Sequence, residues 1–271
     1  MLAEAGRKAK LLRLGNIHET AVVAPGAKLG KNVEIGPYSI IGEHVEIGDN
    51  TVIGPHVVID GWTTIGKDNK IFHGASIGLE PQDLKFDGEK SYLFIGDKNV
   101  IRENVTIHRG TAEGGGETRI GNDNLIMAYC HVAHDCQLGN HIIMSNATNL
   151  AGHVIIEDNV VISGMVGVHQ FVRIGKMSMT GAHSKVVKDV PPYVLVDGHP
   201  AGVNGINVVG LRRNGVPPEL RREIKKAYKI LYRSKLNIDE AIKKMDQEFD
   251  ASEEIEHFLR FLRNVQRGIC R

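Results

Sequence analysis

The sequence repeats itself every six residues, and this repeat constrains the fold more than any other feature. Aliphatic residues fill eleven consecutive sixth positions: Ile17, Val23, Leu29, Ile35, Ile41, Ile47, Ile53, Ile59, Ile65, Ile71 and Ile77. A glycine often follows the aliphatic residue, as at Gly36, Gly42 and Gly48. A single buried strand does not continue such a pattern, whereas short flat strands separated by tight corners do. The repeat therefore predicts an all-β fold, a left-handed parallel β-helix.

The six-residue phase breaks twice along the chain. After Ile77 the next inward positions would be Asp83 and Glu89, and burying an unpaired carboxylate is strongly unfavourable. Residues 79–94 are therefore predicted to leave the wall as a loop, and residues 112–119 form a second loop. The phase then weakens near Val186, and Pro191 is predicted to end the wall.

A different periodicity follows the repeats. Apolar residues recur at helical spacing after Pro217 and Pro218, which predicts a helix with an inward stripe. Two more helices are predicted at about residues 238–249 and 252–266. The predicted division is an N-terminal extension at 1–15, a β-helix at 16–192, a linker at 193–216 and an α-helical C-terminal domain at 217–271.

Composition and charge exclude several classes of protein. The formal net charge of +1 provides no overall field that would attract nucleic acid. Three cysteines form neither a disulfide framework nor a paired metal motif, so we expect a reducing, cytoplasmic location. No stretch has the length and apolarity of a membrane span. Between Arg212 and Lys235 nine basic residues accompany two acidic ones, which predicts a solvated helix face or a surface for an anionic partner.

Histidines are predicted to gather on one face of the β-helix. If three six-residue repeats make one coil, residues 18 apart stack about 4.8 Å from each other. With the two loops left out, His108, His134, His153 and His169 then come from four successive coils of one face. His131 lies on the same coil as His134, and the first loop springs from the same face. A histidine ladder that only packs is the alternative interpretation.

The pair His134-Asp135 is the best candidate for chemistry in this cluster. A neutral imidazole beside a carboxylate is suited to take a proton near neutral pH, and a backbone amide near Gly152 is placed to stabilise an oxyanion. Cys130 and Cys136 occupy small core positions of the repeat rather than nucleophile positions. The glycines at 114–116 are interpreted as a flexible loop tip. The pattern favours acyl transfer, with no cofactor and no metal expected.

Several longer motifs make the chain similar to a known family. They are Gln82-Asp-Leu-Lys85, Arg102-Glu-Asn-Val-Thr-Ile-His-Arg-Gly110, Ala133-His-Asp-Cys136, Leu150-Ala-Gly-His-Val154, Val168-His-Gln-Phe171, Asp189-Val-Pro-Pro-Tyr193 and Ala227-Tyr-Lys-Ile-Leu-Tyr-Arg233. Together they resemble the UDP-N-acetylglucosamine acyltransferases, which begin lipid A synthesis. The resemblance runs from about Ile17 to the C-terminus. It implies a homotrimer with sites between subunits and a donor that carries an (R)-3-hydroxyacyl chain on acyl carrier protein.

The resemblance also implies residue roles. His134 would be the base that activates the glucosamine 3-position, Asp135 would support it, and Gly152 would supply an oxyanion-hole amide. Donor or sugar nucleotide would be held by Gln82, Asp83, Lys85, His131, His153, His169, Gln170, Asn207 and Arg213. Ala182 matches the position that stops the acyl chain, and Met177 or Met179 are further candidates to line that tunnel. The chain departs from the family at Val209, where an acidic residue is usual, and at Asn214, where an arginine is usual.

Other functions stay open at this point. A zinc-dependent carbonic anhydrase of the same fold would bind metal through histidines such as His131, His134 and His153. An N-acyltransferase acting later in lipid A synthesis would carry a separate N-terminal domain, whereas the repeats here begin at Ile17. A structural scaffold would leave the aligned histidines without a use. The sequence settles neither the acyl-chain length nor whether the acceptor is a 3-hydroxyl or a 3-amino group.

Overall fold

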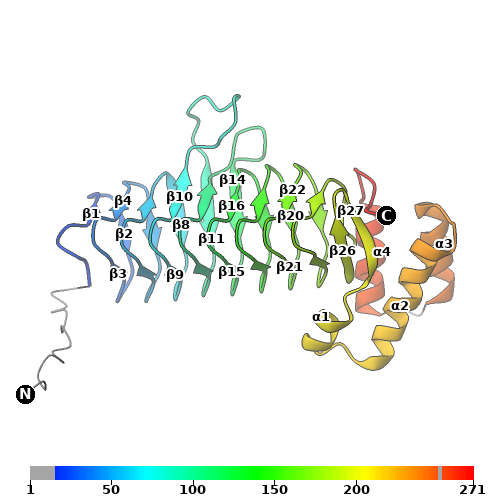
Figure 1. Ribbon diagram of the computed structural model, residues 1–271. Coiled ribbons are helices and arrows are strands. Elements are labelled where there is room, and N and C mark those ends of the chain that lie inside the picture. Colours follow the sequence, from blue (N-terminus) through cyan, green and yellow to red (C-terminus); the bar gives the residue numbers. More distant parts are fainter. Residues whose placement is uncertain (1–15, 250–251) are drawn as a thin grey trace, which may run out of the picture.

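The computed structural model describes residues 16–249 and 252–271, so the predicted N-terminal extension at 1–15 lies outside the described residues. The chain forms a long three-sided β-helix that carries a bundle of helices at its C-terminal end (Figure 1). Two loops project side by side from one edge of the β-helix, near the middle of its length. The fold class predicted from the repeat is confirmed.

The first sheet of the wall carries the predicted histidine face. In spatial order its strands are β1 (Val22–Val23), β4 (Ile40–Ile41), β7 (Val58–Ile59), β10 (Ser76–Leu79), β13 (Thr106–His108), β16 (His131–Val132), β19 (Asn149–Leu150), β22 (Gly167–Val168) and β25 (Lys185–Val186). The strand pairs are parallel, and Ile77 pairs with Ile107, which in turn pairs with Val132. The register predicted across the two loops is therefore confirmed.

The other two sheets complete the triangular wall. The second contains β2 (Lys28–Leu29), β5 (Glu46–Ile47), β8 (Trp62–Ile65), β11 (Tyr92–Ile95), β14 (Glu117–Ile120), β17 (Gln137–Leu138), β20 (Ile155–Ile156) and β23 (Arg173–Ile174). The third contains β3 (Glu34–Ile35), β6 (Val52–Ile53), β9 (Lys70–Ile71), β12 (Val100–Ile101), β15 (Leu125–Ile126), β18 (Ile143–Met144), β21 (Val161–Ile162), β24 (Met179–Thr180), β26 (Val194–Gly198) and β27 (Ala201–Ile206).

The sixth-position aliphatic residues fill the interior of the wall. Ile59, Ile77, Ile107 and Val132 are each 0% exposed, and full burial of one such side chain stabilises the fold by about 1.5–3 kcal/mol. At many corners a non-glycine residue adopts positive φ, as at Asn50 with φ 58°. Side chains at these corners point away from the core, so core packing does not restrict which residue occupies them.

The first loop is shorter than predicted, whereas the second has the predicted length but begins and ends three residues earlier. The strands β11 and β14 already lie in the wall, so the excursions span residues 80–91 and 109–116 rather than 79–94 and 112–119. The six-residue count missed this because β11 and β14 each turn two residues inward. Leu93 is buried together with Ile95, and Thr118 together with Ile120.

The predicted linker at 193–216 is wrong. This segment contains β26, β27 and α1 (Val208–Arg213), and β26 extends the third sheet beyond the proline pair. Val196 pairs with Thr180, sixteen residues earlier rather than eighteen, so the strand falls outside the repeat phase. Val186 is fully buried, so the weaker repeats still form regular wall.

The C-terminal helices close the end of the β-helix. They are α2 (Pro218–Arg233), α3 (Ile238–Glu248) and α4 (Glu253–Arg263), close to the predicted ranges. Ile224, Leu231 and Phe258 pack in one apolar cluster with Tyr193 from the end of the wall. Covering the last coil protects apolar surface that a further repeat would otherwise bury. Among the described residues, no helix combines the length and apolarity needed to cross a membrane.

Candidate active site

The corner between β16 and β17 carries the predicted catalytic pair. His134 Nδ1 lies 2.7 Å from Asp135 Oδ2, and the Asp135 side chain is 0% exposed while that of His134 is 13% exposed. Asp135 takes the left-handed corner conformation with φ 61°, which directs its carboxylate to the side rather than into the core. Neighbours in sequence do not always bond through their side chains, so the contact between His134 and Asp135 depends on this corner conformation.

The Asp135 carboxylate is held in its ionised form. The Thr111 amide donates to Oδ1 at 2.8 Å and the Thr111 hydroxyl donates to Oδ2 at 2.7 Å. Burial alone would raise the pKa of Asp135, but the hydrogen bonds from His134 and Thr111 outweigh it and lower that pKa. A carboxylate that stays charged at neutral pH is available as a fixed acceptor for the imidazole.

The pair gives His134 the properties of a general base. The hydrogen bond to Asp135 raises the pKa of His134, partly opposed by burial. A proton on Nδ1 that is donated to Asp135 leaves the Nε2 lone pair free, an assignment that follows from the hydrogen bond. The free nitrogen can then accept a proton from a substrate hydroxyl or amine.

Gly152 lies directly against the His134 ring. A β-carbon at this position would approach His134 Cε1 to 2.7 Å and Nε2 to 2.9 Å, closer than real contacts allow. Only glycine lets the next coil approach the imidazole without displacing it. The oxyanion role of the Gly152 amide stays a prediction.

A second imidazole lies one coil above the pair. His153 Nε2 is 3.8 Å from Asp135 Oδ2, and the His153 ring stacks on Phe171 with centroids 4.4 Å apart. Burial lowers the pKa of His153, partly opposed by the charge of Asp135. His153 is therefore a neutral neighbour that can donate or accept one hydrogen bond to a substrate.

Two further histidines lie nearby, His131 on the coil of His134 and His108 one coil below. His131 Nδ1 lies 2.7 Å from the Thr106 hydroxyl, and its ring meets that of His108 edge-on at 5.2 Å between centroids. Burial lowers the pKa of His131, and burial together with neighbouring positive groups lowers the pKa of His108 to about 4. Both rings are neutral at pH 7, which keeps positive charge from accumulating around His134.

The first loop brings Gln82, Asp83 and Lys85 above this face. Gln82 lines a cavity of about 680 Å³ together with His108. Asp83 is half-buried and its charge raises the pKa of His134. Lys85 Nζ pairs with Glu113 of the second loop at 2.7 Å, so an anionic substrate group would have to compete with Glu113 for this lysine.

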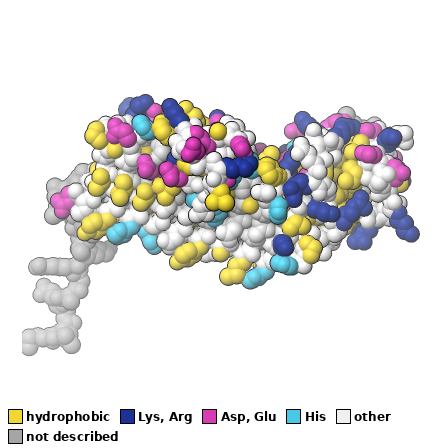
Figure 2. All heavy atoms as spheres, turned by 90° about the horizontal axis from the view of Figure 1, so that it is seen from above, with side chains coloured by type: hydrophobic (Ala, Val, Ile, Leu, Met, Phe, Trp, Pro, Cys, Tyr) yellow, Lys and Arg dark blue, Asp and Glu magenta, His cyan; other side chains and the backbone are white. Residues whose placement is uncertain are grey.

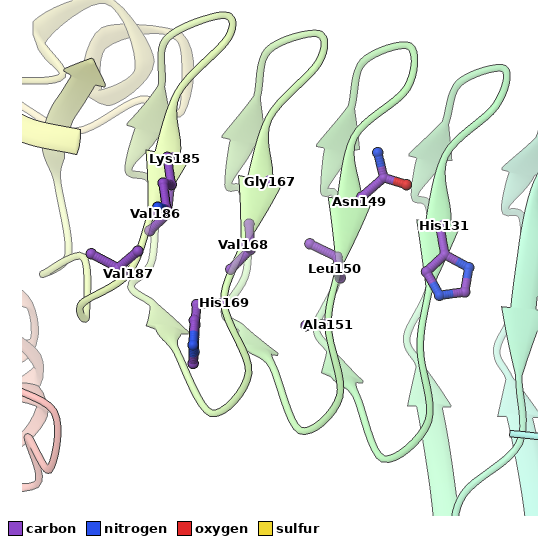
Figure 3. A pocket seen from close by; sticks show the side chains of 10 residues that line it. All are labelled: His131, Asn149, Leu150, Ala151, Gly167, Val168, His169, Lys185, Val186 and Val187. Carbon is purple, nitrogen blue, oxygen red and sulfur yellow. The ribbon is translucent and has the colours of Figure 1, made fainter. Parts of the chain in front are cut away.

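A groove runs along the first sheet from the histidines toward the C-terminal end (Figure 3). It has a volume of about 380 Å³, with His131 at one end and Lys185 and Val187 at the other. Gly167 lies in its middle, where a β-carbon would meet nothing within 4 Å. The small residue on this strand opens the channel along the wall.

Of three other predicted positions, only His169 lines this groove. His169 lines it, and its Nδ1 donates to the Gln170 carbonyl at 3.1 Å. The Gln170 side chain is exposed. Val187, not Ala182, lies one coil above His169, because Val168 pairs with Val186. Ala182 is instead exposed at the corner between β24 and β25, and within one chain it does not line the groove.

The nucleotide residues implied by the resemblance lie apart from the histidines. Asn207 and Arg213 belong to α1 and its cap, beyond the end of the wall (Figure 1). The Asn207 amide is buried and bonded within the chain, donating to the Met177 carbonyl at 2.9 Å and accepting from Gly210 N at 2.9 Å. Asn214 caps the same helix, so one chain does not assemble the whole predicted site.

Basic side chains gather over the C-terminal helices, at the right of Figure 2. Arg222 pairs with Glu219 at 3.0 Å, and Lys226 pairs with Glu248 at 3.0 Å. These pairs are exposed and so contribute little to stability. Lys225 and Lys229, on the same helix, are exposed and add positive charge to this surface.

The donor set expected for zinc is not the one assembled. In the described part of the chain, the group with metal-ligand proximity is His134, Asp135 and His153, and His131 is not among them. Both Asp135 oxygens already accept hydrogen bonds from Thr111 or His134, so their lone pairs are largely occupied. All three cysteines are buried, and burial raises the pKa of Cys136 to about 12, as expected for core residues.

Sequence reasoning missed Thr111, Gly114 and Phe171. Phe171 was detectable, because it lies eighteen residues after His153 and thirty-six after Asp135. Thr111 and Gly114 carried no such signal, because the second loop interrupts the repeat before Glu117. Their contact with Asp135 depends on the path of that loop, which the repeat does not specify.

Comparison with known proteins finds matches to both parts of the chain. Residues 189–270 match the family described as UDP N-acetylglucosamine O-acyltransferase, domain 2, and residues 16–48 and 26–61 match bacterial transferase hexapeptide repeats. The chain is 52% identical over 258 residues to an enzyme of Thiobacillus denitrificans named acyl-[acyl-carrier-protein]--UDP-N-acetylglucosamine O-acyltransferase, covering 95% of this chain and 100% of that one. A relative of the same name from Janthinobacterium is 54% identical, covering 94% and 99%.

Solved structures agree as well. LpxA from Acinetobacter baumannii superposes with a TM-score of 0.92 at 42% identity, covering 95% of this chain and 100% of that one. LpxA from Bacteroides fragilis, a UDP-N-acetylglucosamine acyltransferase, superposes with a TM-score of 0.91 at 48% identity, covering 94% and 99%. The chain belongs to the UDP-N-acetylglucosamine O-acyltransferase family.

Proposed function

We propose that this protein transfers an (R)-3-hydroxyacyl chain from acyl carrier protein to the 3-position of UDP-N-acetylglucosamine, the first step of lipid A synthesis. The observation that carries the proposal is the buried His134–Asp135 pair with Gly152 against its ring. This arrangement supplies a proton acceptor and a close backbone, the parts that acyl transfer needs. A later N-acyltransferase and a carbonic anhydrase account less well for the relatives and for the assembled side chains.

In the proposed reaction, His134 Nε2 takes the proton of the sugar 3-hydroxyl as that oxygen attacks the thioester carbonyl. A new C–O bond forms, and the negative charge on the tetrahedral oxygen is stabilised by the Gly152 amide. Collapse of this intermediate breaks the C–S bond, and the departing sulfur receives the proton from the His134 imidazolium. Asp135 stabilises the transient positive charge on the ring throughout.

The remaining substrate contacts are proposals of the same kind. We assign Gln82, Asp83 and Lys85 to the sugar or donor above the pair, and His131, His153, His169 and Gln170 to the faces around it. The basic side chains of α2 provide a docking surface for an acidic carrier protein, because opposite charges steer such encounters. These roles rest on proximity and on charge.

We further propose that the site is completed in a homotrimer. Within one chain Asn207 and Arg213 lie at the two ends of α1, at the C-terminal end of the wall, whereas His134 follows β16 near its middle (Figure 1). A neighbouring subunit would bring α1 to the histidines. Chains with His134→Ala and chains with Arg213→Ala, each inactive alone, should recover part of the activity when co-expressed and co-purified. Absence of recovery in confirmed mixed oligomers would contradict a shared site.

The direct test of function uses mass spectrometry. Purified protein is incubated with a panel of 3-hydroxyacyl thioesters of acyl carrier protein, each with UDP-N-acetylglucosamine or its 3-amino analogue. The expected product is a nucleotide sugar whose mass increases by one acyl group at the 3-position. If no thioester yields an acylated nucleotide sugar, the proposed function is wrong.

Acyl-chain length offers a second measurement. We propose that the chain lies in the groove of the first sheet, which spans three coil steps from His131 to Lys185, about 14 Å. Ala182 remains the predicted stop if a neighbouring subunit places it at the end of that groove, and Met177 or Met179 are its alternatives. Gly167→Leu should fill the middle of the groove and favour shorter chains, with each excluded CH₂ worth about 0.8 kcal/mol.

Variants at Ala182 distinguish its role in chain selection from that of Gly167 in the groove. Ala182→Met should shorten the preferred chain and Ala182→Gly should lengthen it, whereas neither should change the KM for the sugar nucleotide. A shift with Gly167→Leu and none with the Ala182 variants would assign chain selection to the groove alone. Unchanged profiles in all three variants would contradict both assignments.

A further inference from the structure

The second loop lies directly on the catalytic carboxylate. Thr111 binds both Asp135 oxygens, with its amide 2.8 Å from Oδ1 and its hydroxyl 2.7 Å from Oδ2. Thr111 is 4% exposed and Asp135 is also 4% exposed, so water does not replace these bonds readily. Two donors from one residue fix the plane of the carboxylate and not only its position.

Gly114 supports the same contact. A β-carbon at residue 114 would lie 1.9 Å from Asp135 Cγ and 2.2 Å from Oδ2, so any other side chain would push the carboxylate away. The Gly114 amide also donates to the Thr111 hydroxyl at 3.2 Å. Gly115 and Gly116 differ, because a β-carbon there would meet nothing within 4 Å. Only the first of the three glycines is required by the active site.

The orientation matters because two imidazoles flank one oxygen. Asp135 Oδ2 lies 2.7 Å from His134 Nδ1 and 3.8 Å from His153 Nε2. Rotation of the carboxylate about its Cβ–Cγ bond would transfer this oxygen from one ring toward the other. The bonds from Thr111 oppose that rotation.

We propose that Thr111, supported by Gly114, is a positioning residue for acyl transfer that keeps the Asp135 carboxylate on His134 rather than on His153. The inference rests on the proposed function and assigns to the second loop a role in setting the basicity of His134. Thr111 acts only through Asp135 and needs no contact with substrate. A hydroxyl at residue 111 is therefore required, whereas the methyl group is not.

Other titratable groups also face the pair. Asp83 and Glu113 come from the first and second loops, and His108, His131 and His153 come from the neighbouring strands and corner. The loops are joined to each other by Lys85 with Glu113 and by the Ala112 amide with Glu89. None of these groups is changed by a substitution at residue 111, so a shift in the titration of His134 reports on the carboxylate.

The test compares Thr111→Val with Thr111→Ser and Gly114→Ala. Thr111→Val should lower turnover roughly tenfold with little change in either KM. The acid limb of its pH profile should move to lower pH, because His134 loses part of the bond that raises its pKa. Thr111→Ser should restore both values, and Gly114→Ala should reproduce the Val phenotype. Thr51→Val, which removes a similarly buried hydroxyl in the N-terminal coils, is the matched control and should leave both unchanged.

A measurement without turnover separates this inference from the proposed function. In histidine-labelled protein, the imidazole pKa of His134 can be followed by NMR, with His134→Ala identifying its signal. A lower His134 pKa in Thr111→Val supports the inference even if no acylated product forms. An unchanged or higher pKa, or a turnover loss that Thr51→Val reproduces, overturns it and leaves Thr111 a structural residue.

Discussion

Two columns of corners in the same wall have nearly the same backbone and opposite roles. In the N-terminal coils Asn32, Asn50 and Asp68 adopt φ of 56°, 58° and 59°, and successive side chains are linked by hydrogen bonds of 3.1 Å. At another edge Asp135, His153 and Phe171 adopt φ of 61°, 62° and 65°. The first column supports the fold, whereas the second gathers the side chains that can do chemistry.

The difference between the two columns shows that corner positions of this fold can carry functional side chains. Asparagine and aspartate tolerate the left-handed conformation well, so the first column fits its backbone at little cost. A phenylalanine in this conformation is uncommon and costs of order 1–3 kcal/mol. Phe171 is nevertheless retained there, stacked on His153. The second column therefore gives up local stability for the arrangement of its side chains.

The largest expected effect comes from comparing the removal of a histidine beside the second column with the removal of a histidine at an ordinary corner. His134→Ala should lower turnover by about 10²–10⁴-fold while leaving the fold intact, because the ring acts as base and fills no core space. His56→Ala, at an exposed corner on a different edge of the wall between β6 and β7, should leave turnover unchanged. Steady-state rates and thermal melting measure both. A His134→Ala rate within about tenfold of the parent would contradict the general-base role.

An intermediate effect on stability and turnover is expected when Phe171 is replaced by asparagine, a residue of the first column. Phe171→Asn should relieve the left-handed strain and raise stability by about 1 kcal/mol. It should lower turnover by a factor of about 2–10, because the lost ring pair with His153 is worth roughly 0.5–1.5 kcal/mol. Chemical denaturation and steady-state kinetics give the two values. A variant that is less stable and fully active would contradict the view that Phe171 lowers stability in favour of activity.

The same variant has a defined pH dependence. Burial lowers the folded-state pKa of His153 below 6.5, so the unfolded chain takes up its proton first as the pH falls. The stability that this residue contributes is therefore present above pH 6.5 and is lost as the pH falls through the folded pKa. Removing the Phe171 ring exposes His153 and reduces the shift. The stability gain of Phe171→Asn should consequently be larger at pH 5 than at pH 8, and an equal gain would contradict this cause.

The six-residue repeat predicted the fold and the face that carries the site, and particular residues show which features it did not predict. Ile77, Ile107 and Val132 identified the face and register correctly across two loops, because the eighteen-residue stack has few alternatives. Strand β26 was missed because its pairing is offset by sixteen residues. Thr111 was missed because its contact depends on the loop path. The repeat did not show that Ala182 lies outside the groove within one chain, because the count locates its coil but not its corner.

The smallest expected effect lies in the structural column. Asn50→Ala removes two exposed hydrogen bonds, to Asn32 and to Asp68, and places a β-carbon without a polar partner in the left-handed region. The variant should lose about 1–2 kcal/mol of stability with no change in turnover. Asn50→Gly also removes the hydrogen bonds but accepts positive φ, so it should lose less than the alanine variant. Equal losses would mean that the ladder of side chains, rather than the backbone conformation, stabilises these corners. A loss of turnover in either variant would show that the two columns are coupled through the wall, because Asn50 lines neither the groove of the first sheet nor the cavity beside His108.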